Sequence, residues 1–153
     1  MVGLPLPLAP IILGLMDKNN EIRKGRHCLY DLKAHLVFVT KYRYNVFTDE
    51  HLKRMEKIMR DVCSDFGCEL VEFNGETDHV HLIVSYPPTT QLSTLINSLK
   101  GVSSRLLRKE YPDLRKRYWN NTKLWSPSYY AGSYGGTTTE QIKQYAQNQN
   151  RPH

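Results

Sequence analysis

Residues 68–86, CELVEFNGETDHVHLIVSY, contain two strand-like runs separated by a turn signal. The first run, 68–74, alternates apolar and polar side chains, as expected for a strand with one buried face. Asn74-Gly75 is a dipeptide that favours a tight turn. The second run, 78–86, continues until Pro87 and Pro88 stop it. The stretch therefore predicts an antiparallel β-hairpin.

The segments on either side of this hairpin are predicted to be helices. Upstream, Thr48 is a good N-cap, and apolar side chains recur at helical spacing until Gly67, which ends the run. Downstream, Thr89 or Thr90 can cap a second, longer helix. Its apolar stripe consists of Leu92, Leu95, Ile96, Leu99, Val102 and Leu106. Each helix therefore has one apolar face to bury.

Strand-like segments also flank the two predicted helices. Residues 34–40, AHLVFVT, are rich in β-branched and aromatic side chains, and residues 126–134, SPSYYAGSY, form a comparable run. The order β-α-β-β-α-β is that of the split βαβ arrangement. We therefore expect an α+β fold, ferredoxin-like or RRM-like, whose antiparallel sheet carries helices on one face. Thr137 and Glu140 form a capping box that predicts one further, C-terminal helix.

The second strand of the hairpin carries two histidines, His79 and His81. Side chains two residues apart on a strand point to the same face, so both imidazoles lie opposite Val80 and Leu82, which are expected to face the helices. Paired imidazoles that leave coordination positions free suit a divalent metal with substrate oxygens. The same pattern also fits two histidines that share no role. The neighbouring Asp78 and the basic composition shift the balance towards the metal, but the motif alone does not decide between the two.

The predicted C-terminal helix places Tyr145 and Gln149 one turn apart on one face. A tyrosine hydroxyl becomes a nucleophile when a metal or a base lies close to it, and a glutamine carbonyl can bind a metal. If the helix docks against the histidine face, both side chains approach the metal. From the residues alone, Tyr145 is better interpreted as part of a short packing stripe, because nothing in the spacing forces the helix to dock there. Tyr129, Tyr130 and Tyr134 lie in the preceding strand, where packing is the better interpretation.

The chain is basic, with 21 Lys and Arg against 15 Asp and Glu and a formal net charge of +6. This excess favours a polyanionic partner such as nucleic acid, although a generic basic surface is the alternative. Cations after the second helix are interleaved with Tyr118, Trp119 and Trp125, a mixture that suits phosphates and unpaired bases. Trp125 itself is expected in the core. The predicted DNA-binding residues are Lys41, Arg43, Arg105, Arg108, Lys109, Arg115, Lys116, Arg117 and Lys123.

The chain length of 153 residues suits a single domain with one core. Residues 1–16 are apolar, but the run is interrupted by three prolines and is too short to span a bilayer. We expect residues 1–25 to be a loosely ordered extension and residues 26–153 to form the domain. The three cysteines form no CxxC pair, which argues against a disulfide framework and favours the cytoplasm. Cys63 falls on the apolar face of a predicted helix and is expected to pack.

Several motifs occur in the same order as in one known family: DHVHLIV at 78–84, WSPSYYAGSYGG at 125–136 and IKQYAQNQ at 142–149. Together they resemble the HUH single-tyrosine transposases of the smallest bacterial and archaeal insertion sequences. This IS200-like family is related to the transposases associated with repetitive extragenic palindromes. The likeness covers residues 26–149, nearly the whole predicted domain. It implies an enzyme that cleaves and rejoins single-stranded DNA.

The resemblance also implies roles for individual residues. His79, His81 and Gln149 would bind Mg²⁺ or Mn²⁺, and Tyr145 would form a 5′-phosphotyrosine linkage with the cut strand. It further implies a homodimer that can exchange its C-terminal helices, DNA ligands with hairpins at the element ends, and a cytoplasmic enzyme that is nucleoid-associated when bound to DNA.

Two other functions are compatible with the residues. A ferredoxin-like domain can hold single-stranded RNA or DNA without cutting it, as RNA-recognition domains do. The aromatic side chains that such domains carry on their central strands are replaced here by His79 and His81. A metal-dependent nuclease could instead use water, with Tyr145 structural. A covalent protein–DNA adduct would distinguish the three functions.

Overall fold

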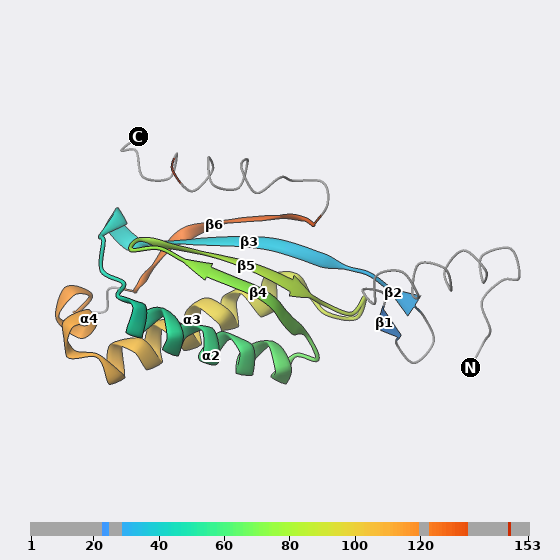
Figure 1. The fold of residues 1–153 in the computed structure, drawn as a ribbon, viewed down its shortest axis with the longest axis horizontal. Helices are drawn as coiled ribbons and strands as arrows, with labels where there is room; N and C mark the ends of the chain where they lie inside the picture. Colours follow the sequence, from blue (N-terminus) through green and yellow to red (C-terminus); the bar gives the residue numbers. More distant parts are fainter. Residues whose placement is uncertain (1–22, 25–28, 120–122, 135–146, 148–153) are drawn as a thin grey trace, which may run out of the picture.

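The computed structural model describes residues 23–24, 29–119, 123–134 and 147. Its main sheet contains β3 (Lys33–Thr40), β4 (Glu69–Gly75), β5 (His79–Ser85) and β6 (Trp125–Ser133). Neighbouring strands are antiparallel and lie in the order β4-β5-β3-β6. The helices α2 (Asp49–Asp65) and α3 (Leu92–Glu110) cover one face of this sheet (Figure 1). The predicted ferredoxin-like α+β fold is therefore confirmed.

Four smaller elements complete the described part of the chain. The 3-10 helix η1 (Lys41–Arg43) follows β3 directly, and α4 (Pro112–Arg117) follows α3. The short strands β1 (Arg23–Lys24) and β2 (Leu29–Tyr30) pair with each other in a separate sheet. Of the predicted extension 1–25, only residues 23 and 24 are described. In the described ranges, no helix is both long and apolar enough to cross a membrane.

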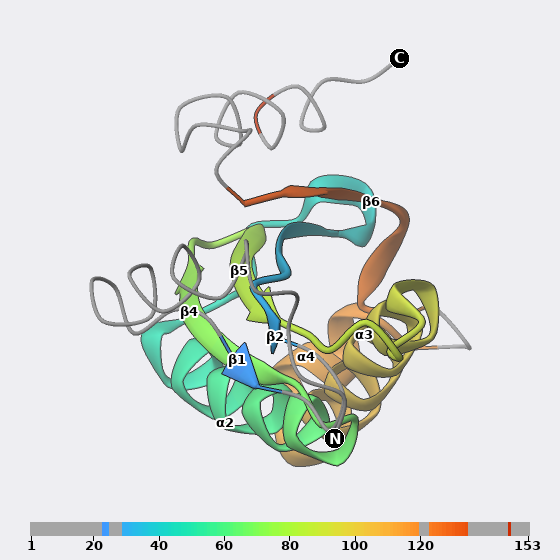
Figure 2. The ribbon, with the colours of Figure 1, turned by 90° about the vertical axis from the view of Figure 1, so that its right-hand side faces the viewer.

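The core lies between the sheet and the two long helices, which run side by side in Figure 2. Alternate strand residues supply it, among them Leu36 and Phe38 from β3 and Val80 and Leu82 from β5. The helices contribute the apolar stripes that their sequences predict, and Cys63 is fully buried among them. Burial raises the pKa of the Cys63 thiol to about 12, so this cysteine is an unreactive packing residue.

The start of α2 is fixed by a reciprocal cap between Thr48 and His51. The backbone N–H of His51 donates to Thr48 Oγ1 at 3.3 Å, and the backbone N–H of Thr48 donates to His51 Nδ1 at 3.1 Å. Because Nδ1 accepts, Nε2 carries the ring proton and faces Asp113 Oδ2 at 3.2 Å. The predicted N-cap is confirmed, and its partner additionally ties α2 to α4. Gly67, at φ 70°, ends α2 as predicted.

Two predicted boundaries are wrong. Asn74 and Gly75 form no turn but pair with His81 and Val80 as the last residues of β4. The reversal lies at Thr77 and Asp78, flanked by a hydrogen bond from the Glu76 N–H to the His79 carbonyl at 2.9 Å. The Thr77 carbonyl accepts hydrogen bonds at 2.9 Å from the backbone N–H groups of residues 46 and 47. Distant backbone donors, rather than local turn propensity, hold the turn there.

The helix α3 begins later than predicted, after Gln91 rather than after Thr89 or Thr90, and it has no side-chain cap. The Thr90 N–H donates to the Pro87 carbonyl at 3.0 Å, which closes a separate turn ahead of the helix. The Thr90 hydroxyl lies 3.7 Å from Cys68 Sγ and therefore faces β4 instead of the helix N–H groups.

Gly132 in β6 and Gly101 in α3 differ in the space available for a side chain, so the same substitution by alanine tests how tightly each position is packed. A Cβ at Gly132 would collide with the Tyr130 hydroxyl and would lie 2.7 Å from Tyr130 Cζ, so Gly132→Ala must displace this ring. We expect a loss of about 1–3 kcal/mol in the free energy of unfolding. Gly101 in α3 has no atom within 4 Å of the same position, and Gly101→Ala should stabilise by about 0.5–1 kcal/mol. Urea unfolding measures both, and equal shifts would contradict the prediction.

Candidate functional site

His79 and His81 lie together on the sheet face opposite the helices. Their ring centroids are 4.9 Å apart, and the ring planes are inclined at 76°. Across the sheet, His81 pairs with Val37 of β3 and His79 pairs with Val39, and residues directly opposite on paired strands share a face. The alternation predicted for β5 is therefore confirmed, with Val80, Leu82 and Val84 in the core beneath the helices and both imidazoles on the other face.

Asp78 fixes the orientation of the His79 ring. Its Oδ1 lies 2.7 Å from His79 Nδ1, and its Oδ2 lies 3.4 Å from Arg43 Nη2. A carboxylate can only accept, so His79 Nδ1 donates, and in the neutral ring Nε2 then carries the lone pair. That nitrogen is directed away from Asp78 and lies 4.0 Å from Glu76 Oε2. The ring is thus held in the tautomer that a metal ligand requires.

The turn after β3 brings Arg43 to this carboxylate. Tyr42 and Arg43 both adopt left-handed backbone conformations, with φ of 64° and 56°. Such conformations cost non-glycine residues roughly 1–2 kcal/mol each, so the surrounding contacts must hold them. The Thr40 N–H donates to the Asp78 carbonyl at 2.9 Å, and the Arg43 guanidinium contacts the Asp78 side chain. Burial lowers the pKa of Arg43, and the Asp78 charge opposes that shift.

The side chains here fit a divalent cation as far as they are described. The site offers two neighbouring imidazoles, and the His79 ring donates a hydrogen bond to the Asp78 carboxylate. Catalytic metal centres use nitrogen ligands of this kind. No cluster of three His, Cys, Asp or Glu suited to a metal occurs within the described ranges. Gln149, the predicted third ligand, and Tyr145, the predicted nucleophile, both lie outside the described residues.

Tyr129 and Tyr130 of β6, and Tyr134 directly after it, all contact neighbouring side chains. Tyr130 is half-buried against Val37 and Val39. The Tyr134 ring stacks on His35 at 5.2 Å between centroids, and the Lys100 ammonium lies 5.4 Å from the Tyr129 centroid. These contacts support the packing interpretation of all three.

The cations predicted to bind DNA fall into two groups. Some are used inside the fold. Arg43 contacts Asp78, Arg108 Nε donates to the Ser104 carbonyl at 3.1 Å, and Arg115 Nη1 donates to the Lys109 carbonyl at 3.1 Å at the end of α3. The exposed cations are Arg105, Lys109, Arg115, Lys116, Arg117 and Lys123, so Arg115 lies on the surface although it also contacts the end of α3. The half-buried Lys41 places its ammonium 5.5 Å from the Tyr42 centroid. Contact of either group with DNA stays a prediction.

Two contributors to the site were not assigned roles from the sequence. The sequence indicates Asp78 only as a neighbour of the histidines, although a carboxylate adjacent to an imidazole is a usable signal for an orienting partner. Glu76 gave no signal, because its approach to His79 depends on the reversal lying at residues 77 and 78 rather than at Asn74-Gly75.

Comparison with known proteins gives a consistent result. The family model described as "Transposase IS200 like" matches residues 28–149. The ISDra2 transposase TnpA of Deinococcus radiodurans is 34% identical over 129 residues, covering 84% of this chain and 91% of the relative. The transposase for insertion sequence element IS200 of Salmonella typhimurium is 31% identical over 123 residues, covering 80% of each chain.

A solved crystal structure from Deinococcus radiodurans R1 has the same fold, with 35% sequence identity and a TM-score of 0.76. The match covers 85% of this chain and 99% of that one. The sequence matches and this structural match agree over most of the chain length. The chain belongs to the IS200-like transposase family.

Proposed function

We propose that this transposase cuts and rejoins single-stranded DNA at the ends of its insertion sequence, using a divalent metal and Tyr145 as the nucleophile. The observation that carries the proposal is the pair His79 and His81, side by side on the sheet face opposite the helices. The carboxylate of Asp78 on His79 Nδ1 supports a ligand role for this ring. Family membership supports the reaction class.

In the proposed reaction, the Tyr145 hydroxyl oxygen attacks a backbone phosphorus, and the bond from that phosphorus to the 3′ oxygen breaks. The strand upstream leaves as a free 3′-OH, which takes up one proton while the tyrosine loses one. The downstream strand stays attached as a 5′-phosphotyrosine. A 3′-OH from a second cut strand then attacks this phosphorus and releases Tyr145, so the strands join without hydrolysis.

His79, His81 and Gln149 would hold the metal, Mg²⁺ or Mn²⁺. When bound, the ion would supply Lewis-acid polarisation of the phosphodiester. Asp78 would keep His79 Nε2 available for it, while Arg43 would balance the charge of that carboxylate. The partners we propose are DNA ends that form hairpins and a second copy of the chain that exchanges the C-terminal helix.

The test is a covalent-adduct assay. The full-length protein is incubated with single-stranded DNA from the ends of its own element, with Mg²⁺ or with EDTA, and is then denatured. We expect a denaturation-resistant protein–DNA adduct that forms only with the metal and is lost in Tyr145→Phe. Cleavage without an adduct would support a nuclease that uses water, and binding without cleavage would support a non-catalytic binding module. Either of these results would overturn the proposal.

A further inference from the structure

Two aromatic side chains stand out on the surface of the described residues. Trp119 is 69% exposed and Tyr42 is 63% exposed, more than any other large apolar side chain in these ranges. Large aromatic side chains normally bury their area, and exposed ones at a cationic surface are typical of binding sites. Tyr42 belongs to η1 and Trp119 follows the end of α4, and a hydrogen bond from the Tyr118 hydroxyl to the Lys41 carbonyl joins the two segments at one corner of the fold.

Buried contacts hold the two aromatics at this corner. Tyr118, which precedes Trp119, is fully buried, and its hydroxyl donates to the Lys41 carbonyl at 3.1 Å. The Tyr44 ring lies between its neighbours, with centroids 5.5 Å from Tyr42 and 5.8 Å from Tyr118. The exposed rings are therefore carried by anchored backbone.

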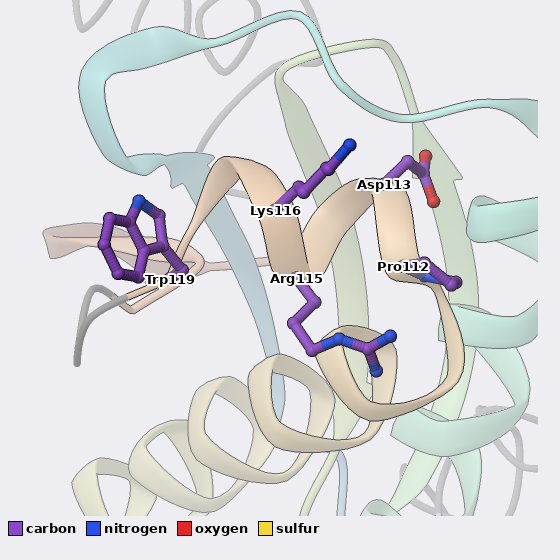
Figure 3. Close-up of a pocket in the computed structure, with 5 residues that line it drawn as sticks. All are labelled: Pro112, Asp113, Arg115, Lys116 and Trp119. Atoms are coloured by element: carbon purple, nitrogen blue, oxygen red, sulfur yellow. The ribbon is translucent and has the colours of Figure 1, made fainter.

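A hollow beside Trp119 shows what could rest against the indole. Its lining comes from α4 and from Trp119, two residues after the end of that helix: Pro112, Asp113, Arg115, Lys116 and Trp119. Figure 3 shows Trp119 and Pro112 at opposite ends, with the Lys116 side chain projecting between them and Arg115 turned toward α3. The acidic member, Asp113, already faces the His51 ring at 3.2 Å. The hollow thus has the Trp119 indole at one end, and the exposed Lys116 side chain extends away from that ring along α4.

The cationic side chains at this corner indicate which kind of partner it would bind. Lys41 and Arg117 lie over the rings of Tyr42 and Tyr44, at 5.5 Å and 4.4 Å from the centroids, respectively. Lys116, which precedes Arg117 in α4, is exposed. Cations interleaved with exposed aromatic faces are complementary to single-stranded nucleic acid, whose phosphates need charge and whose unpaired bases need a stacking surface. Paired DNA would leave the aromatic faces unused.

We propose that Trp119 and Tyr42 form a stacking platform for unpaired bases of the substrate strand, with Lys116 and Arg117 holding the adjoining phosphates. This inference rests on the proposed function for the identity of the strand. The proposed platform is joined to the histidine site by the backbone turn that follows β3. The left-handed turn at residues 42 and 43 directs Arg43 to Asp78, beside His79, and leaves Tyr42 exposed.

The two tryptophans of the sequence make the test direct, because Trp119 is exposed and Trp125 is buried. Full-length protein is titrated with a 20-nucleotide oligothymidylate and with a blunt, fully paired DNA duplex that has no loop. We expect the single strand to quench tryptophan emission more strongly than the duplex does. Trp119→Phe, which keeps only Trp125, should remove the quenching.

Affinity for the labelled oligothymidylate, measured by anisotropy over a range of salt concentrations, separates stacking from charge. Trp119→Ala and Tyr42→Ala should each lower the affinity on the order of tenfold without changing the salt dependence. Lys116→Gln should lower the slope of log affinity against log salt by about 0.7. Tyr134, which follows β6 and is 47% exposed, supplies the matched control, and Tyr134→Ala should bind like the wild type.

Two results would overturn the platform. One is binding of the oligothymidylate with unchanged emission and with wild-type affinity in both alanine variants. The other is shielding of Trp119 that appears when protein concentration alone is raised, which would assign the corner to contact between copies. The adduct assay distinguishes this failure from failure of the proposed function. A failed platform leaves adduct formation intact, whereas a failed function leaves quenching without an adduct.

Discussion

His79→Ala should lower metal-dependent strand cleavage roughly 10³-fold at saturating DNA. A bound metal contributes several kcal/mol to stabilising a phosphoryl-transfer transition state, and about 1.4 kcal/mol corresponds to a factor of ten in rate. His79 is the ring whose Nε2 is kept available by Asp78, so its loss removes an oriented ligand. Cleavage rates with Mg²⁺, together with Mn²⁺ affinity measured by calorimetry, test the expectation. DNA affinity in EDTA should not change.

His35→Ala is the matched control for this substitution. His35 lies on the same sheet face, paired with Ile83 of β5, and is buried under Tyr134. Burial lowers the pKa of His35, while Glu72 opposes this shift. The His35 variant should keep its Mn²⁺ affinity even if it is less stable. Equal loss of metal affinity in both variants would show that the His79 effect is structural and would contradict the metal assignment.

Asp78→Asn should fall between these two variants. The amide can still approach His79 Nδ1, but without a charge it no longer fixes the ring tautomer or balances Arg43. Loss of such an orienting partner typically costs about 10–100-fold in metal affinity. A graded series, with the wild type strongest and His79→Ala weakest, is the pattern that a positioning role predicts.

The sequence predicts the fold because its signals are local and mutually consistent. Alternation along residues 78–86 assigns Val80 and Leu82 to the core and both histidines to the other face, and the structure agrees. The N-cap at Thr48 and the end of α2 at Gly67 are equally local. The position of the hairpin turn is not set by a local signal, because the backbone N–H groups of residues 46 and 47 donate to the Thr77 carbonyl.

The site is predictable only where it depends on strand alternation. The contact between Arg43 and Asp78 joins residues 35 positions apart, and the backbone conformation at Tyr42 that accompanies it has no signature in a non-glycine residue. Arg43 and Arg115 look like the other surface cations in the sequence, yet they contact a buried carboxylate and the carbonyls of α3. Composition identifies a basic surface but not which of its cations the fold itself uses.

Trp125→Ala should lower the free energy of unfolding by about 3–5 kcal/mol. The indole is 3% exposed and packs against Phe38 and Phe47, at centroid distances of 5.8 and 5.4 Å. Its Nε1–H donates to Ser103 Oγ at 2.9 Å, and that hydroxyl donates to the Leu99 carbonyl at 2.6 Å. The residue therefore joins β6 to α3 through both packing and a buried hydrogen-bond chain.

Two substitutions separate these contributions. Trp125→Phe keeps an aromatic ring in the cavity but removes the indole donor to Ser103, and the loss of one buried hydrogen bond costs about 1–3 kcal/mol. Trp119→Ala removes the same side chain from an exposed site and should shift stability by no more than about 0.5 kcal/mol. Urea unfolding followed by far-ultraviolet circular dichroism suits all three variants, because this signal does not depend on tryptophan emission. Similar losses in Trp119→Ala and Trp125→Ala would contradict the assignment of Trp125 to the core, since only a buried indole leaves a cavity behind.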